Sequence, residues 1–455
     1  MLTDLSFLRY PLPPDVQRLF EAGDFARMER VIALRLEDSR TPQPLKARLR
    51  FQLDIARELP RAYPHTQSEL LEQLTARVRD FAPEELDALR DDGTLDWRYV
   101  DGEVRFKDNC ISNLFKTRAE YAARAVDPEI AAEIRRSAAR LDGVIADMKR
   151  QGGLRARFTL RETMRVESGD LTPGETLRVH LPLPVVHAQV RSAALLSTSH
   201  APKLIAPEDE PHRTVYFELP YEPGMTVSAD IAYEIDAPYC QPSPEDVSPE
   251  QPSFDTEELS PHVVFTPYLR ALARDIVGDE TNPLRKARLI YDFITTQSVY
   301  RFMPPYLTVT NIPEYFLSGL RGDCGVQALT FITLCRLVGI PAQWQAGLYT
   351  TPVSVGNHDW ARFYVAPYGW LFADCSFGGS AYRAGAMDRW NFYFGNLEPW
   401  RLPLCRAFQQ ELNPPRRFLR RDPYDNQSGE IETLHRALRR DEYDTDANVL
   451  SYEVL

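Results

Sequence analysis

The stretch Arg321-Gly-Asp-Cys-Gly-Val-Gln-Ala328 opens the part of the sequence that decides the fold. Cys324 is followed by apolar side chains at helical spacing, which predicts a buried helix that begins at this cysteine. Asp323 is a suitable N-cap, and Gly339 with Pro341 marks the end of the helix. We therefore expect the Cys324 sulfur at a helix amino terminus, where free N–H groups and the helix dipole favour the thiolate, the nucleophilic form of the side chain.

Two later stretches contain further candidate catalytic residues: Asn357-His-Asp-Trp360 and Gly369-Trp-Leu-Phe-Ala-Asp374. Residue patterns predict strands over 343–350, 358–365 and 370–374, with a turn at 366–369. The last two strands would form an antiparallel hairpin whose open end brings His358 close to Asp374. The roles then follow: Cys324 attacks a carbonyl carbon, His358 moves the proton, and Asp374 holds the imidazole in one tautomer and orientation.

The order of these motifs resembles the core of the transglutaminase-like superfamily, a papain-related fold. The resemblance rests on Gly-x-Cys, Gly-Ile-Pro-Ala, His-x-Trp and Gly-Trp-x-x-x-Asp, found here at 322–324, 339–342, 358–360 and 369–374. An ordered set of motifs is far more specific than a lone cysteine. Two positions differ from the common pattern, since Cys375 follows the acid in place of proline and Gln343 replaces an arginine. The resemblance implies a cysteine enzyme that acts on amides.

Three further residues are candidates for supporting roles. Gln297 and Tyr300 lie in the segment before Cys324 and carry side chains able to donate a hydrogen bond to an oxyanion. Trp360 lies two residues after His358, on the same strand face, and would shield the imidazole from water. Tyrosine and tryptophan with apolar neighbours also pack in ordinary cores, so packing roles remain open for both.

Composition limits the classes of function. The chain has 455 residues, 44% of them hydrophobic, and a net charge of −12 from 53 basic and 65 acidic residues, which argues against a general nucleic-acid or anionic-membrane binder. No 18-residue apolar window occurs, and the first ten residues lack the basic and apolar regions of a signal peptide. The six cysteines contain no CxxC pair, so we expect neither a metal site, nor a cofactor, nor disulfides, and a cytoplasmic location.

The patterning predicts an α+β, multidomain chain. Residues 1–150 read as mostly helical, with a hairpin at Asp101-Gly102, and 151–239 as a β-sandwich-like domain, because apolar and polar residues alternate there between turn signals. Residues 240–261 form a proline- and acid-rich linker, 262–405 the transglutaminase-like core, and 406–455 a C-terminal tail. The tail carries four arginines that predict a solvated or ion-paired face, namely Arg416, Arg417, Arg420 and Arg421.

Three functions fit this sequence, and each would use a protein or peptide as its partner. In the first, a peptide or glutamine amide forms a thioester with Cys324, and water resolves it, as in a protease or amidase. In the second, a lysine amine resolves the same thioester, as in a protein-glutamine transamidase. In the third, the chain is a binding scaffold whose triad is no longer used. Hydrolysis is the favoured reading, because water is the default acceptor and no calcium-loop pattern occurs. The sequence gives no oligomeric state.

Overall fold

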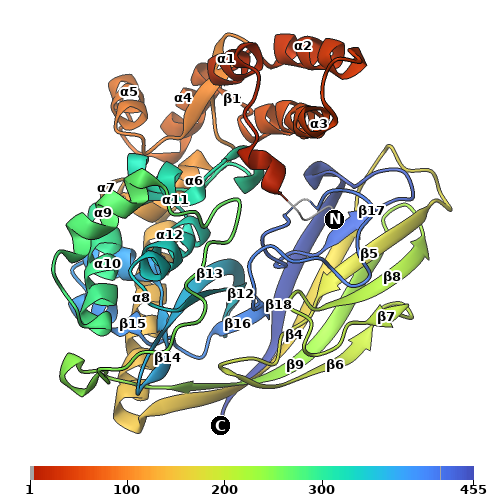
Figure 1. Ribbon diagram of the computed structural model, residues 1–455. Coiled ribbons are helices and arrows are strands. Elements are labelled where there is room, and N and C mark those ends of the chain that lie inside the picture. Colours follow the sequence, from red (N-terminus) through yellow and green to blue (C-terminus); the bar gives the residue numbers. More distant parts are fainter. Residues whose placement is uncertain (1–4, 421) are drawn as a thin grey trace.

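The computed structural model describes residues 5–420 and 422–455, and Figure 1 shows its arrangement. Helices gather at one end of the molecule, a β-sandwich forms one side, and a core of helices around a sheet lies between them (Figure 1). The prediction of an α+β, multidomain chain is thus confirmed. Residues 1–4, part of the stretch behind the cytoplasmic expectation, and Arg421 lie outside the described residues.

The N-terminal part is mostly helical up to Gln151, as the sequence predicts. Its three-stranded sheet has the order β1-β3-β2, and its β2–β3 hairpin turns at Asp101 and Gly102, both at positive φ. The elements are α1 Pro14–Ala22, α2 Phe25–Glu37, α3 Gln43–Glu58, β1 His65–Thr66, α4 Gln67–Arg77, α5 Pro83–Asp91, β2 Trp97–Val100, β3 Glu103–Phe106, α6 Cys110–Thr117, α7 Ala119–Ala123 and α8 Pro128–Gln151.

Two four-stranded antiparallel sheets form the sandwich, with strand orders β17-β5-β8-β7 and β18-β4-β9-β6. Along β4 and β9 buried and less buried residues alternate, as expected for strands with one face turned inward. The strands are β4 Gly153–Val166, β5 Thr176–Pro182, β6 Val190–Thr198, β7 Leu204–Ile205, β8 Thr214–Pro220, β9 Thr226–Pro238, β17 Glu430–Glu432 and β18 Tyr443–Val454.

The expectation of a C-terminal tail over 406–455 is wrong, because this segment completes the sandwich. β17 pairs with β5, and the long strand β18 runs along β4 between the sandwich and the core (Figure 1). The predicted ion-paired arginine face exists in part, since Arg416 and Arg420 are buried and both pair with Glu430. Such buried pairs fix the path of the chain because an unpaired buried charge is costly.

The core folds around a five-stranded antiparallel sheet of order β15-β14-β13-β12-β16. Predicted strands 343–350, 358–365 and 370–374 correspond to β12, β13 and β14. The elements are α9 Pro267–Val277, α10 Pro283–Gln297, β10 Val299–Tyr300, α11 Ile312–Gly319, β11 Arg321–Gly322, α12 Cys324–Leu337, β12 Ala342–Thr351, β13 Ser354–Val365, β14 Gly369–Ala373, α13 Cys375–Arg383, α14 Met387–Phe392, β15 Phe394–Gly395 and β16 Arg401–Cys405.

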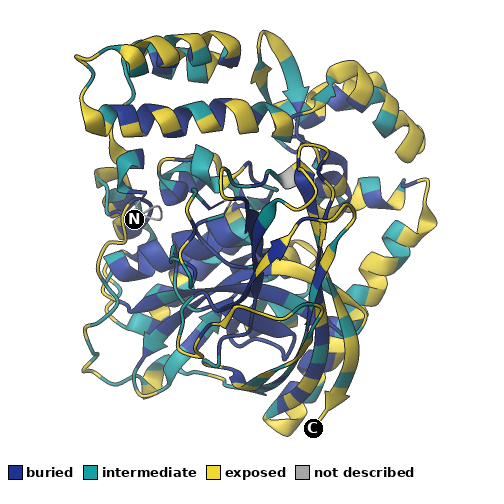
Figure 2. Cartoon of the chain, turned by 90° about the vertical axis from the view of Figure 1, so that its right-hand side faces the viewer, coloured by how far each residue is buried: buried dark blue, intermediate teal, exposed yellow. Residues whose placement is uncertain are grey.

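Helix α12 lies at the centre of this core and is buried along nearly its whole length. Its Phe331 ring packs against Phe363 of β13 at 5.5 Å between ring centroids. Figure 2 shows the contrast with the peripheral helices, which carry one buried and one exposed face, while the central elements are buried throughout. The predicted linker 240–261 has little regular structure and bonds to the sheet, for example through the Ser248 N–H, which donates to the Ala366 carbonyl.

Candidate active site

Cys324 lies at the first position of α12, as the sequence predicts. The Asp323 carboxylate caps the helix by accepting a hydrogen bond from the Val326 N–H at 3.2 Å. The preceding strand β11 pairs in parallel with β10, so that Gly322 lies opposite Tyr300. These contacts fix the helix start, and Cys324 keeps part of its surface accessible to solvent.

His358 and Asp374 meet at the end of the β13–β14 hairpin. The imidazole Nε2–H donates to the Asp374 carboxylate at 2.7 Å, and Arg401 of β16 forms an ion pair with the same carboxylate oxygen at 2.9 Å. Burial opposes ionisation of Asp374, but its interactions with His358 and Arg401 outweigh burial and lower its pKa to about 2. Asp374 is therefore an ionised hydrogen-bond acceptor that holds the ring in one orientation.

The imidazole of His358 is neutral near pH 7. Burial lowers its pKa to about 4, although the Asp374 charge acts in the opposite direction. With Nε2–H directed at Asp374, Nδ1 carries the lone pair and is the ring nitrogen able to accept a proton. The arrangement thus supplies a base that is unprotonated at neutral pH.

The sulfur of Cys324 contacts Asp359, the residue between His358 and Trp360. The thiol donates to the Asp359 carboxylate at 3.6 Å. Side chains alternate along a strand, so Asp359 faces α12, whereas His358 and Trp360 share the opposite face. Among the described residues, the hydrogen bonds of the Cys324 side chain include none to His358.

The thiolate expected from the helix terminus does not fit this environment. Burial raises the pKa of the Cys324 thiol well above its ordinary value, the charges of Asp359 and Asp323 raise it further, and Lys116 lowers it in part. Two nearby carboxyl groups and desolvation thus outweigh the helix dipole. The resting side chain is the thiol, and its proton has to leave during the reaction.

The structure brings two of the three supporting candidates close to the site. Tyr300 is buried on β10, whose partner strand β11 directly precedes Cys324, and burial and its neighbours Cys324, Asp323 and Asp359 raise its pKa well above the usual value. The Trp360 ring stacks beside His358 at 6.0 Å between centroids and donates its N–H to Gln345. Gln297 is exposed, and its amide donates to Thr296.

Four neighbours of the site were not predicted from the sequence. Asp359 and Arg401 contact the sulfur and the Asp374 carboxylate, respectively. The Tyr306 hydroxyl donates to Asp323. Gln427, from the segment expected to be a tail, donates to the His358 carbonyl at 3.0 Å and to the Asp359 carboxylate at 2.6 Å. Only Asp359 had a sequence signal, its place inside the His-x-Trp motif, whereas the others come from segments distant in the sequence.

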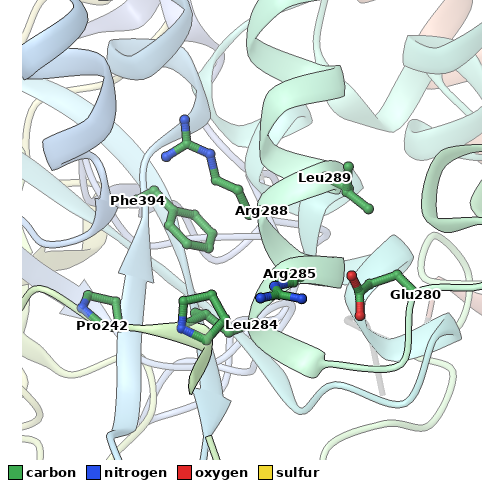
Figure 3. Close-up of a pocket in the computed structure, with 8 residues that line it drawn as sticks. Pro242, Glu280, Leu284, Arg285, Arg288, Leu289 and Phe394 are labelled. Carbon is green, nitrogen blue, oxygen red and sulfur yellow. The ribbon is translucent and has the colours of Figure 1, made fainter. Parts of the chain in front are cut away.

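A cavity of about 410 Å³ lies outside this site (Figure 3). Pro242 and Pro244 of the linker, the first turns of α10 and Phe394 line it, and none of the six candidate residues does. Within 5–420 and 422–455, no group of three His, Cys, Asp or Glu side chains gathers as metal ligands. No helix in these ranges has the length and apolar character needed to cross a membrane.

Three known proteins are similar to parts of this chain. An uncharacterized protein of Haemophilus influenzae is 27% identical over 150 residues, a match that covers 27% of this chain and 41% of that protein. A putative cysteine protease from Cytophaga hutchinsonii aligns with a TM-score of 0.41 and 14% identity, over 66% of this chain and 91% of that one. The periplasmic domain of TgpA from Pseudomonas aeruginosa aligns with a TM-score of 0.27 and 16% identity, over 52% and 92%.

A sequence model of a known family also matches, and it covers residues 270–375. This range holds the whole motif set, from the helices before Cys324 to Asp374 and the residue after it. Residues 270–375 of this multidomain chain thus match the transglutaminase-like superfamily.

Proposed function

We propose that this protein is a cysteine-dependent acyl-transfer enzyme that forms a thioester between Cys324 and the carbonyl of a peptide or glutamine amide, and that water then hydrolyses the thioester. One observation carries the proposal: a buried, neutral imidazole held by an ionised aspartate lies on β13 next to Asp359, the residue that contacts the Cys324 sulfur. Strongly shifted pKa values of an imidazole and a carboxyl group within one set of motifs are typical of a functional site.

The chemistry follows the order of a thiol acyl transfer. In this structure the Cys324 sulfur contacts Asp359, on the face of β13 opposite to His358, so the reaction requires a shift of the start of α12 or of His358 that brings the sulfur to Nδ1 when substrate binds. The sulfur forms a bond to the carbonyl carbon, and the thiol proton passes to His358. The C–N bond then breaks as His358 returns this proton to the leaving nitrogen. Water attacks the thioester and releases the acid and the thiol.

The negative charge that develops on the carbonyl oxygen needs donors. The first N–H groups of α12 have no partner within the helix and point out of its amino terminus. Tyr300, a neighbour of Cys324, supplies a side-chain donor. Trp360 covers one side of the imidazole and limits the access of water to it.

A glutamine-containing protein, incubated with this enzyme and a primary amine and analysed by mass spectrometry, tests the proposal. Gln-to-Glu conversion or backbone cleavage that is lost in Cys324→Ser supports hydrolysis. Amine adducts would instead identify a transamidase. If none of the three products depends on Cys324, the chain is not an enzyme of this class, and a binding scaffold is the remaining interpretation.

A further inference from the structure

Lys116, near the end of α6 in the helical part, extends to the candidate active site. Its ammonium group lies 3.8 Å from the centroid of the Tyr300 ring and 5.2 Å from that of Phe302. The side chain is exposed. Its ammonium group nevertheless packs against two aromatic rings among protein atoms, so Lys116 combines a cation–π contact with a position at the edge of the candidate site.

A hydrogen bond from the backbone to a side chain joins α6 to the loop before Cys324. The Asn113 amide oxygen accepts a hydrogen bond from the Phe302 N–H at 3.2 Å. Tyr300 lies on β10, which pairs with β11 directly before Cys324. The ammonium group thus lies over a side chain of β10, which pairs with the strand directly before α12. The fold therefore fixes its position relative to the Cys324 sulfur.

The charges near Lys116 show which groups surround it. Burial lowers its pKa, and Cys324, Asp323 and Asp374 act in the opposite direction. Lys116 in turn lowers the pKa values of both the Cys324 thiol and the His358 imidazole. One cation from another part of the chain thus acts on the sulfur and on the imidazole together.

Lys116 forms no ion pair with a carboxylate within residues 5–420 and 422–455. By contrast, the nearby Arg118 pairs with Asp92, and Arg124 pairs with Glu85 at 2.6 Å. The chain carries a net charge of −12, and Asp323, Asp359 and Asp374 lie around the sulfur. Without a cation at this point, the site would repel an anionic substrate.

We propose that Lys116 determines substrate specificity by binding a carboxylate close to the reacting carbonyl of the acyl donor. The substrate class is then an acidic peptide, or an amide with a neighbouring carboxylate. This inference rests on the proposed role of Cys324 as the nucleophile. A lysine suits the task because its ammonium group is a point charge on a flexible stem, able to follow the carboxylate of a bound chain.

Alkylation of Cys324 by two matched reagents tests this role without a known substrate. Iodoacetate carries a carboxylate next to the carbon that sulfur attacks, and iodoacetamide is its neutral analogue. In both reactions an S–C bond forms and iodide leaves. The ratio of the iodoacetate rate to the iodoacetamide rate, read on the Cys324 peptide by mass spectrometry, should fall about five- to tenfold in Lys116→Met.

Two control variants test whether the change in the rate ratio comes from the charge of Lys116. Lys116→Arg keeps the charge and should keep the ratio within about twofold of the parent chain. Lys203→Met removes an exposed lysine of the sandwich and should leave both rates unchanged. An unchanged ratio in Lys116→Met, whether both rates fall together or neither changes, overturns the specificity role. If neither reagent labels Cys324 in the parent chain, the proposed nucleophile fails, and this inference with it.

Discussion

At the scale of single residues, the protonation of Cys324 is decided by its acidic neighbours. Asp359 accepts the thiol hydrogen bond, and the carboxyl groups of Asp359 and Asp323 oppose formation of a thiolate. Burial and the nearby carboxyl groups of Asp323 and Asp422 also raise the pKa of Asp359 well above its usual value. The proton therefore stays on the Cys324 sulfur or on the Asp359 carboxyl group until a base removes it.

Replacement of Asp359 by asparagine should make Cys324 more reactive. The amide carries no charge, and its NH₂ group donates to sulfur, which favours the thiolate whichever group held the proton before. We expect the apparent pKa of the thiol to fall by about one unit. The pH dependence of iodoacetamide labelling at Cys324 measures it, and an apparent pKa equal to or above that of the parent chain would contradict the account.

At the scale of elements, α12 approaches its neighbours closely at its first turn. A Cβ atom built on Gly325 would lie 2.6 Å from the Asp359 carboxylate, and it would also meet the hydroxyl of Tyr306 and the ring of Trp344. Only glycine lets the helix start pass this close to β13 and the loop before α11. The short approach is what brings the sulfur within reach of the strand that carries His358.

Gly325→Ala should therefore destabilise the chain and disturb the site. Displacing Asp359 and Tyr306 is expected to lower the free energy of unfolding by about 1–3 kcal/mol. Gly143→Ala is the matched control, because Gly143 lies within α8 with open space around it, and alanine there should be neutral or stabilising by up to about 1 kcal/mol. Urea unfolding compares the two, and equal effects would refute the close-contact argument.

Local signals made the start of α12 and the β13–β14 hairpin predictable from sequence. Asp323 lies next to the helix that it caps, and the turn at 366–369 joins neighbouring strands. The pairing of Glu430 with His180 and of Asp444 with Arg165 was not predictable, because the partners lie more than 200 residues apart. Lys116 had no signal at all, since only the packing of α6 on the loop before Cys324 brings it to the site.

At the scale of the whole molecule, buried neutral histidines connect the parts of the fold. Burial lowers the pKa of His262 to about 3 and that of His358 to about 4, and it also lowers the pKa values of His180 and His212. His262 bonds to the Tyr424 hydroxyl, and His212 to the Ala407 carbonyl, both in the segment that returns to the sandwich. Burial at these positions, rather than the hydrogen bonds, is what favours the uncharged rings.

Acidification should therefore destabilise the fold. Between about pH 6.5 and pH 4 the unfolded chain binds protons at these histidines and the native chain does not, so stability falls as pH falls. At pH 5 each buried histidine lowers the free energy of unfolding by up to about 2 kcal/mol relative to neutral pH. The urea midpoint should be lower at pH 5 than at pH 7.5. The difference between the two midpoints should be smaller in His262→Gln, which lacks one buried ring, than in His435→Gln, the control at an exposed histidine. Equal midpoints at both pH values would disprove this.

The most direct test of the central claim is acyl transfer to Cys324 from p-nitrophenyl acetate, followed as a burst of nitrophenolate and as an acetyl adduct by intact-mass spectrometry. The account predicts acetylation at Cys324 that slows by about 10²–10⁴-fold in His358→Ala, the usual effect of losing a general base. Acetylation of the His358→Ala variant at the parental rate, or on another cysteine alone, would contradict it.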